Sequence, residues 1–177
     1  MTEKTEINKL PSHWFAIRVK SRSEKKVLDD LQHQNIEAYV PLQRKLRQWS
    51  DRKKWVEMPL ISGYVFVYII KKDYEKVLQV YNVVCYVFFE GKAAIIKDED
   101  INLLKRLLGQ HEVELDVTIE QLKPGQLVEI ISGPMTGVIG ELIDFQGKNK
   151  VALRIPPLGY TLLVETPRKS LITYIVK

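Results

Sequence analysis

The sequence contains a single cysteine and no long apolar run. Cys85 has no partner for a disulfide within the chain, and a structural zinc ion normally needs four Cys or His ligands, so neither cross-link is expected. No stretch approaches the roughly 20 consecutive apolar residues of a membrane span. Residues 1–10 also lack the apolar core and cleavage site of a signal peptide. These absences predict a soluble, cytoplasmic protein without a cofactor, which we expect to be a monomer.

The motifs of common enzymes are missing as well. The three histidines are scattered, and there is no H-E-x-x-H metal motif, no nucleophile elbow and no phosphate-binding G-x-x-x-x-G-K loop. Asp98, Glu99 and Asp100 are consecutive, so on a helix they would not share a face, and they suit its amino end better than a metal ion. The sequence therefore predicts a protein that binds other molecules and catalyses no reaction.

Charge, in contrast, is abundant and unevenly placed. The chain has 27 Lys and Arg against 22 Asp and Glu, a formal net charge of +5. Residues 1–108 carry 20 basic and 14 acidic side chains, residues 109–123 carry 1 and 4, and residues 124–177 carry 6 and 4. Within residues 44–54, six basic residues accompany one acidic residue, and a tryptophan lies in this segment and another directly after it. Such a segment is typical of a surface that binds a polyanion.

The first 108 residues combine strand and helix patterns. Residues 13–20 alternate apolar and polar positions and predict a strand, whereas 36–42, which contains a proline, predict a strand at a sheet edge. Ser21 and Glu24 have the spacing of a capping box, which predicts that a helix begins there. Further predicted elements are a hairpin or loop over 43–57, a short helix over 73–80, a strand over 83–89 and a helix over 98–108.

Residues 60–70 have the strongest strand pattern. Tyr64, Phe66 and Tyr68 share one face, and branched aliphatic residues occupy the other. The aliphatic face suits packing beneath helices, whereas an aromatic face with hydroxyl groups suits a half-wet interface. We therefore expect the two faces of this strand to have different roles.

The remaining residues change character twice. Residues 109–123 are acidic, with apolar side chains at alternate positions 113 to 119, and predict a linker that is partly extended. From residue 124 onward, short β segments alternate with glycine-containing turns and predict a small barrel. The predicted fold class is α+β: an α/β sandwich with an antiparallel sheet over 12–108, the linker over 109–123 and a β-barrel over 124–177.

Several motifs carry a family resemblance. The run Pro124–Ile130 and the glycines of the following turns, Gly133, Gly137 and Gly140, resemble a KOW motif, an SH3-like barrel. His13–Ala16, Ser23–Val27 and Pro59–Val67 resemble the NGN domain of the NusG family. The resemblance covers roughly residues 12–176, and the chain is identified as a member of that family. Residues 46–55 further resemble the UpxY-type paralogues that act on capsular polysaccharide operons.

The resemblance implies a transcription elongation or antitermination factor. Such a factor binds RNA polymerase through its NGN domain and reduces pausing or termination, here in an operon-specific way. The family's hydrophobic polymerase contact corresponds to Ile61, Tyr64 and Phe66, and its second polymerase contact to Glu75 and Lys76.

Contact with nucleic acid is implied at the end of the first strand and the start of the first helix. Non-template DNA or nascent RNA would meet Lys20, Arg22, Lys25 and Lys26, because cations beside a helix amino terminus bind phosphate well. Arg52, Lys53 and Lys54 form a second candidate contact within the basic segment. For both groups the alternative is a charged surface that is only solvated.

The barrel has several candidate partners. In the family it contacts a small-subunit ribosomal protein, termination factor Rho or RNA, and Phe145, Leu158 and Tyr160 are our candidate contacts. The β-branched residues after 127 predict a barrel that does not refold into helices. A ribosome-associated, RNA-binding KOW protein is the alternative function, and it would leave the aromatic face of residues 64–68 unexplained.

Overall fold

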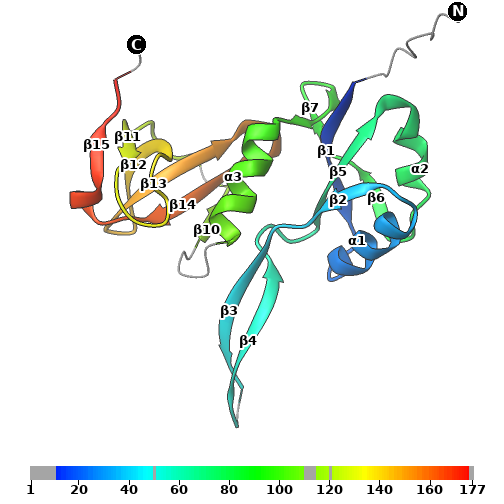
Figure 1. Cartoon of the computed structure of the whole chain (residues 1–177), viewed down its shortest axis with the longest axis horizontal. Coiled ribbons are helices and arrows are strands. Elements are labelled where there is room, and N and C mark those ends of the chain that lie inside the picture. The colour runs from blue at the N-terminus through cyan, green and yellow to red at the C-terminus, as the bar shows by residue number, and fades with distance from the viewer. Residues whose placement is uncertain (1–10, 50, 110–114, 120, 176–177) are drawn as a thin grey trace, which may run out of the picture.

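The computed structural model describes residues 11–49, 51–109, 115–119 and 121–175. Figure 1 shows two bodies, each built on its own sheet, and a long β-hairpin that projects away from both. The N-terminal body combines helices and strands, whereas the C-terminal β-domain (residues 121–175) is built from strands. This architecture confirms the predicted α+β class with antiparallel sheets. Within these ranges, no helix is long and apolar enough to cross a membrane.

The N-terminal sheet has the order β2-β5-β1-β6, and β9 also pairs with β1. Its strands are β1 (Ser12–Val19), β2 (Glu37–Tyr39), β5 (Tyr64–Ile70), β6 (Val83–Tyr86) and β9 (Ile95–Ile96). All pairs are antiparallel, and β1 runs beside β5 over seven residue pairs. β1 is central because its side chains are apolar on both faces, while β2 lies at the edge, as its neighbouring proline predicts.

Helices cover both faces of this sheet. One face packs under α1 (Glu24–His33) and under α2 (Tyr74–Leu78), which follows the 3-10 turn η1 (Lys71–Asp73), and the other packs under α3 (Asp98–Gly109). The aliphatic side of β5 joins the cluster of α1 and α2, and its aromatic side joins the cluster of α3. The aliphatic side packs beneath helices as predicted, whereas on the aromatic side Phe66 is fully buried and only Tyr64 and Tyr68 are half-buried, as expected for a half-wet face.

The start of α1 differs from the prediction. The capping residue is Ser23, which makes no side-chain capping hydrogen bond, so the predicted capping box of Ser21 and Glu24 is wrong. Residues 21 and 22 form a turn instead, with Arg22 at φ 62°. Glu24 is buried, and its Oε1 accepts a hydrogen bond of 2.7 Å from the Gly63 N–H. A carboxylate in the first helical turn thus fixes the loop that enters β5.

The basic segment forms a regular hairpin, which we call the hairpin arm. Its strands are β3 (Leu42–Gln48) and β4 (Lys53–Pro59), paired from Leu42↔Pro59 to Gln48↔Lys53. A second small hairpin, β7 (Phe88–Phe89) with β8 (Lys92–Ala93), interrupts the predicted strand over 83–89. Each hairpin forms a two-stranded sheet of its own, so the observed element order is longer than the predicted one.

The second sheet contains six antiparallel strands in the order β10-β14-β13-β12-β11-β15. The strands are β10 (Leu115–Thr118), β11 (Gln126–Ile130), β12 (Ile139–Phe145), β13 (Lys148–Ile155), β14 (Tyr160–Glu165) and β15 (Leu171–Thr173). The 3-10 turns η2 (Pro156–Leu158) and η3 (Arg168–Ser170) flank β14. β10 lies within the predicted linker, so part of that linker is an edge strand. Residue 113 of the predicted alternation and residues 1–10 lie outside the described residues.

Gly140 permits close packing of β12 on β13. A Cβ atom at this position would lie 2.6 Å from Val151 Cγ1, 2.7 Å from Leu153 Cδ2 and 2.8 Å from the Ala152 carbonyl oxygen. Gly140 of the KOW-like motif therefore lies where neighbouring backbone and side chains leave no room for a Cβ atom.

Gly140→Ala should lower the free energy of unfolding by about 1–3 kcal/mol, because one added methyl group has to displace a backbone carbonyl in a packed core. Urea unfolding followed by circular dichroism measures the change. Gly109→Ala is the control, since nothing lies within 4 Å of a Cβ atom there. Equal midpoints for the two variants would contradict the packing argument.

Candidate functional site

The aromatic face of the N-terminal body consists of Trp14, Tyr39, Tyr64, Phe66 and Tyr68. Its rings contact each other, with centroids 5.2 Å apart for Trp14 and Tyr68 and 6.4 Å apart for Tyr39 and Phe66. α3 covers part of this face, and the Lys105 ammonium lies 5.0 Å from the Trp14 ring centroid. Burial disfavours the charged phenolate and raises the pKa of Tyr39 to about 12.

The C-terminal β-domain covers another part of the aromatic face. The Tyr64 and Tyr160 rings meet edge to face, with centroids 5.5 Å apart and an interplanar angle of 86°. Burial, together with a hydrogen bond to Tyr64, raises the pKa of Tyr160. The Arg18 guanidinium lies 5.9 Å from the Tyr64 ring centroid. One hydrophobic cluster therefore runs from the N-terminal body into the β-domain, an arrangement that we call the closed arrangement.

The closed arrangement brings two predicted sites together. Ile61 and Phe66, predicted to contact polymerase, are 2% and 0% exposed, and Tyr64 is half-buried. Leu158 and Tyr160, predicted to contact a partner of the β-domain, belong to the same cluster. Phe145 lies elsewhere, in a small cluster with Ile143, Ala152 and Leu163. The three predicted contacts of the β-domain thus belong to two separate clusters.

Strand β10 ties the two bodies together. The Gln43 amide, oriented to satisfy both of its groups, donates to the Leu115 carbonyl oxygen at 3.1 Å and accepts from the Leu115 N–H at 2.7 Å. On the other side β10 pairs with β14, and the buried Lys150 ammonium contacts the Asp116 carboxylate at 2.5 Å. The base of the hairpin arm is therefore joined to the β-domain through β10, a strand within the segment 109–123 that the sequence predicts to be a linker.

The predicted nucleic-acid contact lies where β1 turns into α1. We call Lys20, Arg22, Lys25 and Lys26 the basic turn, and all four side chains are exposed. Lys25 pairs with Glu57 of β4 at 3.6 Å, whereas Lys20, Arg22 and Lys26 form no ion pair with any residue that the structure describes. This pair also places the basic turn beside the base of the hairpin arm.

Sequence reasoning missed Tyr81, which lies in the loop between α2 and β6. Its ring is 68% exposed, and the ammonium groups of Lys20 and Lys26 lie 5.3 Å and 5.5 Å from its centroid. The available signal was a tyrosine in the short segment between two predicted elements, and this signal becomes informative only when the folded chain places the segment next to the basic turn.

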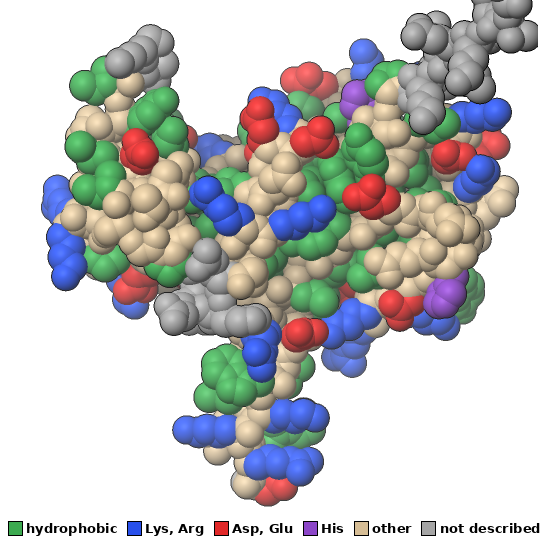
Figure 2. All heavy atoms as spheres, viewed as in Figure 1, with side chains coloured by type: hydrophobic (Ala, Val, Ile, Leu, Met, Phe, Trp, Pro, Cys, Tyr) green, Lys and Arg blue, Asp and Glu red, His purple; other side chains and the backbone are tan. Residues whose placement is uncertain are grey.

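The hairpin arm carries the second predicted nucleic-acid contact. Arg52, Lys53 and Lys54 are exposed at its far end, and Figure 2 shows basic side chains along both edges of the arm. Trp49 and Trp55 are also more than half exposed, and the Arg44 guanidinium lies 5.7 Å from the Trp55 ring centroid. The arm thus offers cations and flat rings to solvent on an element that projects from the body.

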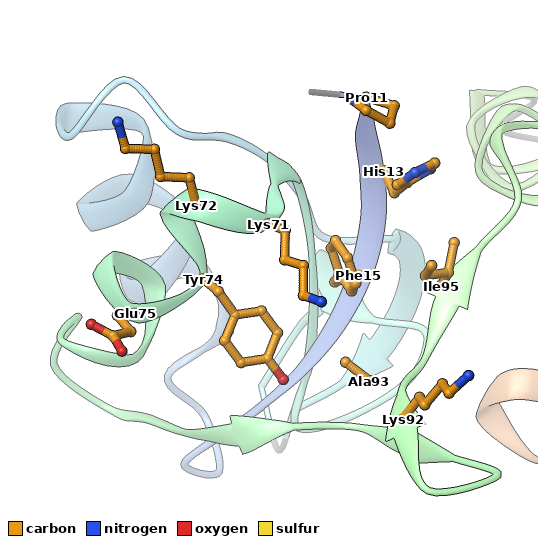
Figure 3. A pocket seen from close by; sticks show the side chains of 10 residues that line it. All are labelled: Pro11, His13, Phe15, Lys71, Lys72, Tyr74, Glu75, Lys92, Ala93 and Ile95. Carbon is orange, nitrogen blue, oxygen red and sulfur yellow. The ribbon is translucent and has the colours of Figure 1, made fainter. Parts of the chain in front are cut away.

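Glu75, from the predicted second polymerase contact, lines an open cleft of about 740 Å³. Figure 3 shows this cleft between η1 and α2 on one side and β8 and β9 on the other, with the Phe15 and Tyr74 rings inside and Lys71 and Lys92 nearby. Lys76 is not part of the lining, and it pairs with Asp73 at 2.6 Å. The two predicted residues therefore have different surroundings.

The described ranges contain no group of three or more His, Cys, Asp or Glu side chains that could hold a metal ion. Cys85 is a free, half-buried thiol in β6.

Comparison with known proteins identifies the fold. The family model described as "Transcription termination factor nusG" matches residues 12–105. The chain belongs to the NusG family. A transcription termination/antitermination protein NusG of Streptococcus pyogenes serotype M1 is 27% identical over 167 residues, which cover 86% of this chain and 90% of that protein. The solved structure described as "Domain interaction in Thermotoga maritima NusG" is 26% identical, covers 92% of this chain and 97% of its own, and has a TM-score of 0.51.

Membership of the NusG family confirms the resemblance stated for the sequence. The chain is a NusG-like transcription termination/antitermination factor, and proteins of this family are transcription factors rather than enzymes. The UpxY-type specialisation, the domain boundaries and the individual contact residues remain predictions.

Tyr160→Ala should weaken the closed arrangement. An aromatic pair contributes about 1 kcal/mol beyond its buried area, so the ratio of closed to open molecules should fall about fivefold. Small-angle X-ray scattering of the full chain measures this change as a larger radius of gyration. Tyr174→Ala, an exposed tyrosine after β15, is the control. A Tyr160→Ala profile identical to that of the control would show that the ring pair does not hold the two bodies together.

Proposed function

We propose that this NusG-family chain binds RNA polymerase through its aromatic face and reduces pausing or termination at particular operons. The observation that carries this proposal is the edge of that face at Tyr64, where the ring of Tyr160 from the β-domain of the same chain meets it edge to face. Apolar rings that need such a cover are typical of a protein-binding surface. The operon-specific role rests on the UpxY-like sequence of the hairpin arm.

The predicted residues of this contact have two different roles. Phe66 packs in the same cluster as Ile101, Leu104 and Leu107 of α3, so it positions the face from within. Tyr64 is partly exposed even beside the β-domain, so it contacts the partner directly. Opening of the closed arrangement would uncover Tyr64 together with Leu158 and Tyr160. The same motion would then free the β-domain for a ribosomal protein, for Rho or for RNA.

A second polymerase contact would lie at the cleft beside Glu75. The cleft combines two aromatic side chains with basic ones, and it opens on the side of the sheet that carries α2. This side lies opposite the aromatic face, because Phe15 and Trp14 alternate along β1. Contacts on both sides of one rigid sheet allow the body to bridge two parts of a large enzyme.

Nucleic acid would follow the basic turn and the hairpin arm. Lys25 and Glu57 lie 3.6 Å apart, so these two cationic elements are side by side. A displaced strand of non-template DNA, or nascent RNA, could run from the unpaired cations of the turn to Arg52, Lys53 and Lys54 of the arm. The exposed rings of Trp49 and Trp55 suit unstacked bases along this route.

Tyr64→Ala and Tyr160→Ala should change the affinity for core RNA polymerase in opposite directions. Loss of Tyr64 should weaken binding about 10- to 30-fold, the range for an aromatic anchor. Loss of Tyr160 should tighten binding up to about fivefold, because more molecules are already open. Biolayer interferometry with the full chain measures both. Unchanged binding by Tyr64→Ala would contradict the proposed contact, and binding to ribosomes but not polymerase would favour a ribosome-associated function.

Replacement of Lys20, Arg22 and Lys26 by glutamine should weaken binding to single-stranded DNA and reduce its salt dependence. Loss of three phosphate contacts should lower the slope of log affinity against log salt by about 2. Fluorescence anisotropy at several salt concentrations measures the slope. Glutamine at Lys71, Lys72 and Lys92 is the charge-matched control, because these residues lie around the cleft. Equal slopes for the two triple variants would mean that the basic turn is only solvated.

A further inference from the structure

Tyr81 has an unusual setting for an exposed tyrosine. Its neighbours are fixed, because Val80 is buried and the Val83 N–H donates to the Val80 carbonyl oxygen at 3.1 Å. The Lys20 N–H donates to the Asn82 carbonyl oxygen at 2.9 Å, which fastens the loop to the end of β1. Asn82 itself adopts a left-handed conformation, with φ 71°. The ring is therefore held out to solvent on a short turn that is anchored on both sides.

Two cations lie over the Tyr81 ring. They are the ammonium groups of Lys20 and Lys26, and neither forms an ion pair with a described residue. An exposed aromatic ring alone is common on protein surfaces and needs no function. A ring on an anchored turn, with two ammonium groups over it, is different, because it offers a flat apolar surface and the counter-charges for phosphate at the same place.

We infer that Tyr81 is a stacking platform for one unpaired base of a single-stranded nucleic acid, with Lys20 and Lys26 holding the flanking phosphates. This inference rests on the proposed nucleic-acid contact of the basic turn and adds its selectivity for single strands. Both faces of a base in a duplex are covered by its neighbours, whereas a base in a displaced strand can leave the stack and pack on the ring. An acidic peptide would satisfy the lysines but would gain little from the ring.

Stacking on a ring tolerates any base, since every base has a flat face. The platform therefore selects the single-stranded state rather than a sequence. Because the loop is held by backbone hydrogen bonds in the closed arrangement, little order has to be gained on binding.

Fluorescence anisotropy with the full chain and a labelled 12-nucleotide DNA strand of mixed sequence tests this inference. Tyr81→Leu, which keeps an apolar side chain without a ring, should weaken binding about 5- to 150-fold, the range for one base on an aromatic ring, with an unchanged salt slope. Tyr81→Phe should bind within about twofold of the unaltered chain. Tyr174→Leu is the matched control, and a strand of abasic nucleotides should remove the difference between Tyr81→Leu and the unaltered chain.

The outcomes separate this inference from the proposed function. If Tyr81→Leu binds the intact strand as well as the unaltered chain does, while the glutamine variant of the basic turn binds poorly, the stacking role is wrong and the phosphate contact stands. If both bind normally, the nucleic-acid contact itself is wrong. If Tyr81→Leu loses equal affinity for the strand and for its duplex, the ring does not read an unpaired base, and the inference falls.

Discussion

The strict alternation of β1 and β5 is the constraint on which the rest of this molecule depends. Because successive side chains point to opposite faces, one register gives Val65 and Val67 to the core under α1 and gives Tyr64 and Phe66 to the opposite face. A shift by one residue would exchange the two sets and leave both helices without a matching surface. Sheet register, core composition and binding surface are therefore decided together.

The same alternation explains why the aromatic face requires two covers. Residues of α3 pack in one cluster with Phe66 and Trp14, and the ring of Tyr64 meets Tyr160 of the β-domain. Because the β-domain is part of the same chain, its effective concentration at the aromatic face is high, and it shields this apolar surface from solvent. A partner that binds the face more tightly can still displace it. Strand β10 adds to this cover, because Gln43 and Lys150 hold it from the two bodies at once.

Much of this architecture could be predicted because its causes are local. The alternating pattern of residues 60–70 indicates a strand, and the proline near β2 indicates a sheet edge. The family motifs indicate the order of the domains. Each of these signals lies in neighbouring residues of the chain. The contacts that sequence reasoning missed all join distant segments: Glu24 to Gly63, Gln43 to Leu115, and Tyr81 to Lys20. Each involves a polar or aromatic side chain whose local pattern allows several partners, so only the folded chain decides between them. The UpxY-like specialisation and the individual contact residues stay predictions.

The cationic surfaces lie outside the closed interface, and this affects the order in which the proposed partners bind. The basic turn, Tyr81 and the end of the hairpin arm are exposed while Tyr64 is covered by the β-domain. In the proposed function, nucleic acid can therefore be bound before the β-domain moves, whereas the polymerase contact requires that motion. A molecule that is already bound to the displaced DNA strand experiences a high effective concentration of polymerase. This high concentration offsets the free energy needed to open the closed arrangement. Selectivity for a transcribing complex over free polymerase then follows from geometry, because only the former presents both surfaces at once.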